Sequence, residues 1–295
     1  MIIHISPTVN ELPMGSLPNI ATKIALALVI LVAALVVSFV LVLGYFSLTA
    51  PETSQAVYDY DLELSTTGPL ENATLLIPLP SYYNATTGEN TTVVNLSRTS
   101  FENFDTEKIS VEIEEVNGVP MLNISADRIT PLYTNRIEPI PIMPGENESD
   151  LPQPTHIYAD HYSEETPVPV EMELHMLDTA VDHEIDTRTP LGHEPLFMPY
   201  QITENFSRAE GGMDDDYYLS EGSSGCFVEV PFILTYEADD ENVLSISTEF
   251  QGTNQWWVLG WQSNSYWQRI RHEFQGACNG TYPVRGVLIT GEGVY

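Results

Sequence analysis

The most unusual property of this sequence is its shortage of basic residues. Lysine occurs only twice, at Lys23 and Lys108, and Lys and Arg together number 10 against 42 Asp and Glu, which gives a net charge of −32. Nucleic acids and anionic lipids attract proteins largely through Lys and Arg. The composition therefore argues against a nucleic-acid partner and against electrostatic binding to an anionic lipid surface.

Cysteine is also scarce, and the familiar motifs of enzymes are missing. The chain has two cysteines among 295 residues and is 43% hydrophobic, so one or two domains can form a packed core without a disulfide-rich scaffold. It contains no Gly-x-Ser-x-Gly, Walker, dinucleotide-binding or His-Glu-x-x-His motif. The sequence therefore predicts neither a reaction nor a cofactor, although catalytic carboxylates contributed by distant strands would leave no such motif.

One long uncharged run is present, from Ile24 to Phe46. At about 1.5 Å per residue it reaches roughly 35 Å, enough to cross a hydrocarbon core of about 30 Å. The apolar part of a cleaved signal peptide is shorter, about 7 to 15 residues, and no cysteine follows the run as a lipoprotein requires. The sequence predicts an uncleaved transmembrane helix at 24–46, after a cytoplasmic tail at 1–23 that begins at Met1 or Met14.

The orientation of this helix follows from the residues on its two sides. Lys23 precedes the run, whereas residues 47–66 contain no Lys or Arg, so we expect the N-terminus inside and the rest of the chain outside the cell. About 2.5 Asn-x-Ser/Thr acceptors are expected by chance. The sequence has eight, all after the run: Asn72, Asn84, Asn90, Asn95, Asn123, Asn147, Asn205 and Asn279. This excess predicts a glycosylated ectodomain, although an Asn- and Thr-rich β-protein reaches such a count without any sugar.

The negative charge belongs to the ectodomain, because Glu11 and Lys23 cancel. Such a charge is self-repelling in dilute salt, but at 1 M salt the screening length falls to about 3 Å. The segment AVYDYDLELSTTGPLENATLLIPLP, Ala56 to Pro80, resembles uncharacterised haloarchaeal single-pass membrane-anchored surface proteins. The resemblance implies a β fold at the surface of an extreme halophile, and no activity. The alternative is an acidic surface protein from a low-salt organism.

The ectodomain is predicted to be mainly β. Residues 58–64 alternate Tyr or Leu with Asp or Glu, which is the period of a strand buried on one face. The pair Asn117-Gly118 suits a two-residue hairpin turn. Counting outward from this turn pairs Ile113 with Leu122, Val111 with Ile124 and Glu112 with Asn123. This register places Asn123 on the solvent side, where a glycan is tolerated.

Composition divides the ectodomain into a first β-module at 47–136, a proline-rich linker or long loop at 137–167, and a second β-module at 168–295. Alternating segments in the second half predict further strands, so the predicted architecture is one β-sandwich with an excursion or two sandwiches in tandem. A helical spacing of Trp267, Ile270 and Phe274 between Ser265 and Gly276 predicts a short helix near the C-terminus.

The two cysteines, Cys226 and Cys278, lie in the exported region, where thiols oxidise. The sequence predicts a disulfide between them, which would close a loop of 53 residues and stabilise the fold by about 4 kcal/mol. A reactive Cys/His pair is the alternative, but no local motif supports it.

No metal site is predicted. Five histidines fall between His156 and His193, yet their spacing matches no ligand motif, and His175 is placed on a solvent-facing strand position. The run Asp214, Asp215 and Asp216 is a weak candidate for a cation, since it lacks the spacing of a calcium loop.

Aromatic residues concentrate in one short segment, which is predicted to form part of the core. The same segment is the candidate binding patch, because exposed Trp stacks on sugars or anchors partner proteins and two of the few arginines adjoin it. The patch consists of Trp256, Trp257, Trp261, Trp267, Arg269 and Arg271.

Two functions are open at this point. The first is a non-enzymatic anchored protein with a structural or binding role at the cell surface, whose partners are the membrane and another envelope or membrane protein. The second is an anchored extracellular hydrolase acting on glycans, with paired carboxylates beside the Trp cluster.

Overall fold

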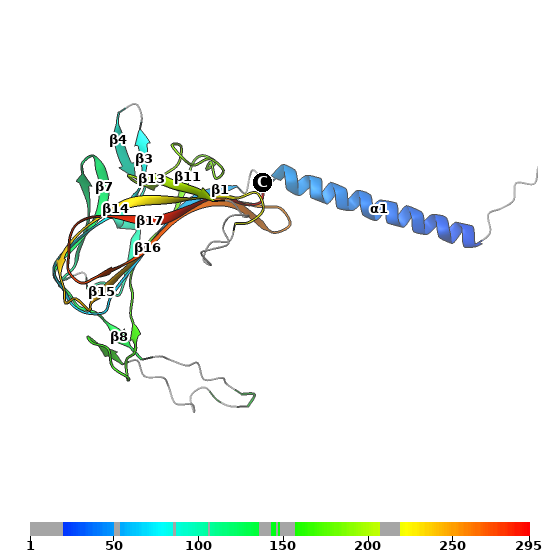
Figure 1. Ribbon diagram of the computed structural model, residues 1–295. Helices are drawn as coiled ribbons and strands as arrows, with labels where there is room; N and C mark the ends of the chain where they lie inside the picture. The colour runs from blue at the N-terminus through cyan, green and yellow to red at the C-terminus, as the bar shows by residue number, and fades with distance from the viewer. Residues whose placement is uncertain are drawn as a thin grey trace, which may run out of the picture. The chain divides into compact units, whose positions relative to one another are not determined.

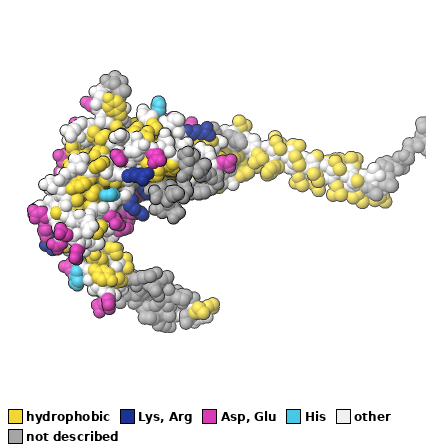
Figure 2. Space-filling view, viewed as in Figure 1, with side chains coloured by type: hydrophobic (Ala, Val, Ile, Leu, Met, Phe, Trp, Pro, Cys, Tyr) yellow, Lys and Arg dark blue, Asp and Glu magenta, His cyan; other side chains and the backbone are white. Residues whose placement is uncertain are grey.

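The computed structural model describes residues 20–49, 54–84, 87–105, 107–135, 143–145, 147, 157–206 and 219–295. It begins with α1 (Ile20–Thr49), a single long helix (Figure 1). Within it, the 25 residues Thr22–Phe46 have a mean hydropathy of 3.3, and none of this stretch is buried. Figure 2 shows apolar side chains over α1, whereas Asp and Glu are scattered over the rest of the chain. The helix is therefore long and apolar enough to cross a membrane, in agreement with the predicted span.

Residues 54–295 are called the β-domain, and the regular secondary structure in the described part of this range consists of strands and one short 3₁₀ helix. In chain order these elements are β1 (Gln55–Thr66), β2 (Leu70–Pro78), β3 (Pro80–Asn84), β4 (Glu89–Thr92), η2 (Leu96–Arg98), β5 (Thr99–Glu102), β6 (Ser110–Val116), β7 (Val119–Ile129), β8 (Tyr133–Thr134), β9 (Tyr158–Ala159), β10 (Val168–Pro169), β11 (Met172–Val181), β12 (Leu196–Phe197), β13 (Gln201–Phe206), β14 (Ser224–Glu237), β15 (Val243–Trp257), β16 (Trp261–Gln275) and β17 (Cys278–Gly293).

Most strands join one antiparallel sheet of 11 strands in the order β5-β11-β1-β15-β16-β17-β14-β2-β7-β6, with β13 paired to β14. Two small sheets, β10-β8-β9 and β12-β3-β4, complete the β-domain. Figure 1 shows the long strands β14 to β17 bending together. The mainly β prediction is confirmed, but the structure does not confirm a sandwich.

The predicted division into modules at 47–136 and 168–295 does not match this sheet. β1 from the first half lies between β11 and β15 from the second. β2 pairs with β14. Because strands from both halves are hydrogen-bonded neighbours in one sheet, the two halves share a single core and are not separate modules.

The alternating pattern of β1 has the predicted effect. Tyr58, Tyr60, Leu62 and Leu64 are fully buried, and the acidic residues between them lie on the opposite face. The predicted β6–β7 hairpin also forms, with Asn117 and Gly118 at positive φ of 53° and 80°. Its register is the predicted one at all three pairs. The alternation within β1 specifies which of its faces is buried, and the two-residue turn specifies the register of the hairpin, so the local sequence pattern predicts both features.

Aromatic rings fill the centre of the core. Phe250 of β15 lies 5.5 Å from Tyr58, 6.4 Å from Phe197 and 6.2 Å from Tyr266 between ring centroids. Gly252 leaves room for one of these rings, because a Cβ atom there would lie 2.4 Å from Cε1 of Tyr266. This packing joins β1, β15, β16 and the segment that contains β12.

The predicted short helix near the C-terminus is wrong, because residues 265–275 belong to the strand β16. Asn264, Tyr266, Gln268 and Ile270 are buried in alternation with more exposed neighbours. Two of these buried residues are polar, which hides the period of two in a hydropathy pattern. Gln268 is nevertheless satisfied in part, since its Oε1 accepts a 2.9 Å hydrogen bond from the Phe197 N–H.

Candidate functional site

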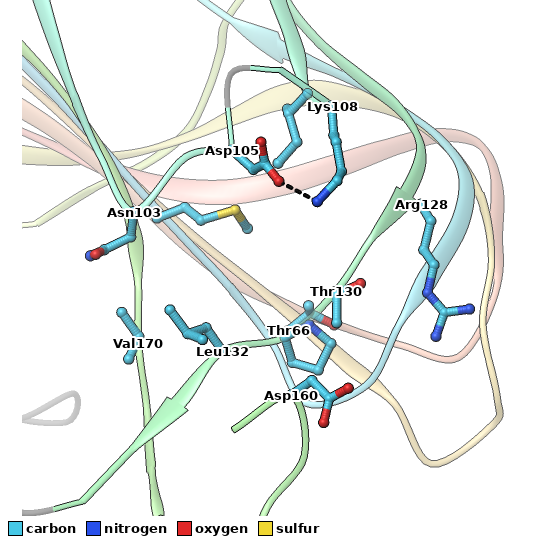
Figure 3. Close-up of a pocket in the computed structure, with 12 residues that line it drawn as sticks. Thr66, Asn103, Asp105, Lys108, Arg128, Thr130, Leu132, Asp160 and Val170 are labelled. Atoms are coloured by element: carbon cyan, nitrogen blue, oxygen red, sulfur yellow. Dashed lines mark hydrogen bonds and ion pairs between the residues drawn. The ribbon is translucent and has the colours of Figure 1, made fainter. Parts of the chain in front are cut away.

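A pocket of about 230 Å³ opens where five segments of the β-domain meet. Its walls come from the end of β1, the β5–β6 connection, the end of β7 with the segment that follows it, the residue after β9 and the start of β11 (Figure 3). Ile109 and Met172 are buried and line it together with Leu132 and Val170. The pocket therefore offers a small apolar floor.

Charged side chains surround this floor. Figure 3 shows Lys108 and Asp105 together on one side of the cavity, with Arg128 and Asp160 at two other places around it. The Lys108 ammonium lies 2.6 Å from Oδ2 of Asp105, and the Arg128 guanidinium lies 2.6 Å from Oε1 of Glu71. All four side chains in these two pairs are at least 39% exposed. Exposed ion pairs of this kind contribute only about 0 to 1 kcal/mol, so both cations can exchange partners at little cost.

Both carboxyl groups of the pocket are ionised at neutral pH. The hydrogen bond from Lys108 lowers the pKa of Asp105. The pKa of Asp160 is lowered mainly by its contact with His161, with a further contribution from the charge of Arg128. The lining thus combines two positive and two negative groups over an apolar surface.

Hydrogen bonds hold the walls in place. Asn103 has a backbone φ of 58°. Its side-chain amide donates a 2.8 Å hydrogen bond to the Glu171 carbonyl, which joins the β5–β6 connection to the residue before β11. The Tyr133 hydroxyl donates to the Thr67 carbonyl at 3.0 Å. The residues of the pocket are far apart in sequence, which is why local motifs did not reveal it.

A second cluster lies on the polar face of the sheet. Asp61 of β1 is paired in register with His175 of β11. Nδ1 of His175 contacts Oδ1 of Asp61 and lies 3.8 Å from Oδ1 of Asp59. One ligand atom from each of the three residues lies within 4.8 Å of the others. His175 is on a solvent-facing position as predicted, but only the strand pairing shows that two carboxylates adjoin it. Such a set is chemically able to coordinate a metal ion.

A third polar group, Glu194, is buried. Its Oε2 accepts a 2.5 Å hydrogen bond from the Tyr58 hydroxyl, and its Oε1 accepts a 2.7 Å bond from the Asp186 N–H. The Tyr58 hydroxyl also lies 2.8 Å from that of Tyr82. Burial, followed by the bond to Glu194, raises the pKa of Tyr58. Because both carboxylate oxygens have donors, the group fixes the segment before β12 against β1.

In the candidate binding patch, Trp257 and Trp261 are not part of the core as predicted, whereas Trp267 packs against a small buried cluster that includes Val287 and Ile289. Trp257 and Trp261 are 39% and 59% exposed, and Trp256 and Trp267 are half-buried. The Trp267 indole N–H donates to Glu292 at 2.6 Å. Arg269 donates to Glu249 at 2.6 Å, and Arg271 is exposed. The candidate patch is thus divided between an exposed turn and the face of β16 that carries Trp267, Arg269 and Arg271.

The exposed tryptophans are also far from the carboxylate pair Asp59 and Asp61. Asp59 is paired with Gln251, which precedes Trp257 by six residues, or about 20 Å along a strand. The structure therefore does not bring Asp59 and Asp61 beside the exposed rings.

The predicted disulfide is wrong, because Cys226 and Cys278 are both free and buried. On the paired strands β14 and β17, Cys226 lies opposite Leu288, whereas Cys278 lies opposite Tyr236. These positions are ten residues apart, about 34 Å along the strands, and a disulfide requires Cα atoms within about 7 Å.

The glycosylation candidates differ in accessibility. Asn123 is only 8% exposed and its side chain donates to Glu114 at 2.8 Å, so the expectation that it tolerates a glycan is wrong. Asn90 is half-buried. Five acceptor asparagines are exposed: Asn72, Asn95, Asn147, Asn205 and Asn279.

Several predicted positions lie outside the residues that the structure describes. These are the Asp214, Asp215 and Asp216 run, His156, the side chain of Asn84 and much of the proline-rich segment 137–167. Within that segment, β9 pairs with β8.

Comparison with known proteins gives no relative: no protein family, no curated protein and no solved structure matches this chain.

Proposed function

We propose that this chain is a single-pass membrane protein whose β-domain has a binding role at the outer surface of an extremely halophilic cell. Its binding site is the Lys108–Arg128 pocket, and its ligand is a small zwitterion with an apolar body, such as a free aliphatic amino acid. The observation that carries the proposal is the lining of this pocket, which combines two cations, two carboxylates and an apolar floor.

The charges of the lining set the class of ligand. Only nine basic residues follow Lys23 in the sequence. Two of these nine line one small pocket. Lys108 and Arg128 suit a carboxylate, which guanidinium and ammonium groups bind directly. Asp160 and Asp105 suit an ammonium group. An anion without a positive group would be repelled by these carboxylates, so a zwitterion is the better match.

The volume of the pocket sets the size of ligand. Sites for drug-sized molecules occupy about 300 to 1,000 Å³, and this pocket is smaller, at about 230 Å³. Its floor of Met172, Ile109 and Leu132 suits a short aliphatic group. At molar salt the screening length is about 3 Å, so recognition depends on direct contacts of the kind that a closely fitting pocket supplies.

The proposed location of the β-domain at the outer cell surface is supported by the residues on the two sides of α1. Lys23 precedes α1, no Lys or Arg occurs in residues 47–66, and every Asn-x-Ser/Thr acceptor follows the helix. The concentration of acidic residues and the resemblance of Ala56 to Pro80 to haloarchaeal surface proteins support the halophilic environment.

The test is calorimetric titration of the full chain in nanodiscs at molar salt with leucine. Two analogues serve as comparisons: leucinamide, which lacks the carboxylate, and 4-methylpentanoate, which lacks the ammonium group. We expect leucine to bind and each analogue to bind about 10- to 150-fold more weakly, because each loses one charge-assisted hydrogen-bonding group worth roughly 1.5 to 3 kcal/mol.

Variants identify the site. Lys108→Met and Arg128→Met should each weaken leucine binding, whereas Arg285→Met, which removes an equal charge from an exposed site on β17 beside Glu204, should leave it unchanged. Equal binding of leucine and both analogues, or no binding of leucine to the wild-type chain, would contradict the proposed ligand class.

A further inference from the structure

The tryptophan segment belongs to the longest stretch of the β-domain sequence that carries no acidic residue. Residues 250–272 contain no Asp or Glu, although 42 of the 295 residues of the chain are acidic. Glu249 and Glu273 flank this stretch on either side. This stretch contains the turn between β15 and β16.

This turn, Trp257–Trp261, exposes large apolar side chains. Trp257, Leu259 and Trp261 are 39%, 53% and 59% exposed. The Val258 N–H donates to the Gly260 carbonyl at 2.9 Å, which closes a tight turn. Leu259 has a positive φ of 56°, a conformation in which Gly or Asn is far more common. A polar turn would be easier to build here, so the leucine requires an explanation beyond the turn itself.

The covalent chain limits how far this turn lies from α1. Gln55, the first residue of β1, is paired with Gln255, two residues before Trp257. α1 ends at Thr49, six residues before Gln55. Six residues span at most about 20 Å even when fully extended. The edge of the β-domain that carries the turn is therefore the edge tethered to the helix.

We propose that the turn Trp257–Trp261, which we call the tryptophan turn, inserts its exposed side chains into the lipid headgroup region of the membrane that α1 crosses. This inference requires that α1 spans the membrane, but not the proposed pocket ligand. Trp favours the membrane interface because its ring is apolar and its N–H is polar. Since no carboxylate lies in residues 250–272, insertion of the turn buries no negative charge.

A second contact with the membrane, in addition to α1, would restrict the tilt of the β-domain. A single helix followed by a short connection leaves a domain free to tilt, whereas the tryptophan turn and α1 together fix one edge of the sheet at the lipid surface. The Lys108–Arg128 pocket includes Thr66, at the opposite end of β1 from Gln55. That end is 11 residues, or about 36 Å of strand, from the tethered edge, so such an orientation would direct the pocket away from the membrane.

Intrinsic fluorescence tests this inference directly, because all four tryptophans of the chain lie at 256, 257, 261 and 267 and none lies in α1. The full chain is reconstituted at molar salt into phosphatidylcholine vesicles, with or without brominated acyl chains that quench nearby Trp. Trp257 and Trp261 are two of four emitters, so we expect about half of the emission to be quenched if both enter the interface. The double variant Trp257→Ser/Trp261→Ser should lose this quenching.

A matched control uses a tryptophan away from the turn. Trp267→Phe removes the ring that is hydrogen-bonded to Glu292 on β16 and should leave the quenched signal of the wild-type chain in place. Circular dichroism of both variants shows whether the sheet is intact.

The contrary outcomes are distinguishable. If the chain floats with vesicles but its Trp emission is not quenched, α1 is inserted and the tryptophan turn is not in lipid. If Trp emission shifts to the blue without lipid quenching and sedimentation shows a dimer, the turn contacts a second copy of the chain. A chain that fails to float removes the premise that α1 spans the membrane. Each of these results would overturn the inference.

Discussion

Glu173 of β11 lies directly opposite Glu63 of β1, and on its other side it lies opposite Glu102 of β5. Three carboxylates thus form a row across adjacent strands. Partial burial and the negative charges of Glu102 and Glu63 raise the pKa of Glu173 above its ordinary value. A sheet built this way is destabilised locally by its own charge, because like charges on directly opposed residues repel.

The first prediction is that Glu173→Gln stabilises the protein. The substitution removes one charge from the row and preserves the size of the side chain, so the free energy of unfolding should increase by about 0.5 kcal/mol in dilute salt. Denaturant titration of the full chain in nanodiscs measures it. The control is Glu112→Gln on β6, whose partner is Asn123, and which should change stability less. An equal or larger gain from the control would contradict the argument.

The second prediction concerns pH. Because the folded-state pKa of Glu173 is raised above the ordinary value of 4.5, the folded protein holds this proton at a higher pH than the unfolded chain does. Its contribution to stability is therefore fully present below pH 4.5 and is lost as pH rises through the raised folded pKa. The stability advantage of Glu173→Gln should be largest at pH 7 and should shrink as pH falls toward 4.5. An advantage independent of pH would exclude a charge effect.

The third prediction is that Cys226 and Cys278 are thiols in the native protein. They are 6% and 7% exposed, and burial raises the pKa of Cys226, which lowers the fraction of reactive thiolate. Alkylation at pH 8 should be slow for the folded chain and rapid for both residues after unfolding. Mass spectrometry under non-reducing conditions measures both states, and a Cys226–Cys278 peptide pair would contradict this register of β14 and β17.

The fourth prediction is a strong dependence of folding on salt. The chain has a net charge of −32, and molar salt reduces the screening length to about 3 Å. The melting temperature should rise between dilute and molar KCl. Sucrose is the control, because it stabilises folded proteins by exclusion from their surface without screening charge. If sucrose reproduced the whole effect of KCl, or if KCl had none, self-repulsion would not be the cause.

The fifth prediction concerns topology. With α1 crossing the membrane once and the β-domain outside, protease added to intact cells should remove a C-terminal epitope tag, while a tag placed before Lys23 stays protected. The same cells opened with detergent provide the control for access to the N-terminal tag. Protection of the C-terminal tag in intact cells would show the opposite orientation.

The sequence alone determined the features that depend on neighbours in the chain. The 23-residue apolar run predicted a membrane-length helix, because span length depends only on consecutive residues. The alternation in β1 and the Asn117-Gly118 turn predicted a buried strand face and a hairpin register, because a period of two and a two-residue turn are local properties.

Only the tertiary structure decided which strands are neighbours. The contact between Asp61 and His175 joins β1 and β11, and the Lys108–Arg128 pocket joins five separate segments. Neither follows from spacing, since antiparallel pairing between distant strands is not encoded in any short segment. The same pairing overturned the Cys226–Cys278 disulfide, because it places the two thiols at opposite ends of one strand pair.

The missed strand β16 shows why a local pattern can fail. Asn264 and Gln268 are polar, so the remaining apolar residues of this segment recur at a helical spacing. Both are buried because the fold supplies partners: Asn264 accepts a 2.9 Å hydrogen bond from Thr187, and Gln268 accepts one from Phe197. A buried polar side chain is stable only where such partners exist. Since those partners come from a segment about 70 residues earlier in the chain, the sequence determined the composition of this strand, and the tertiary structure decided that it is a strand.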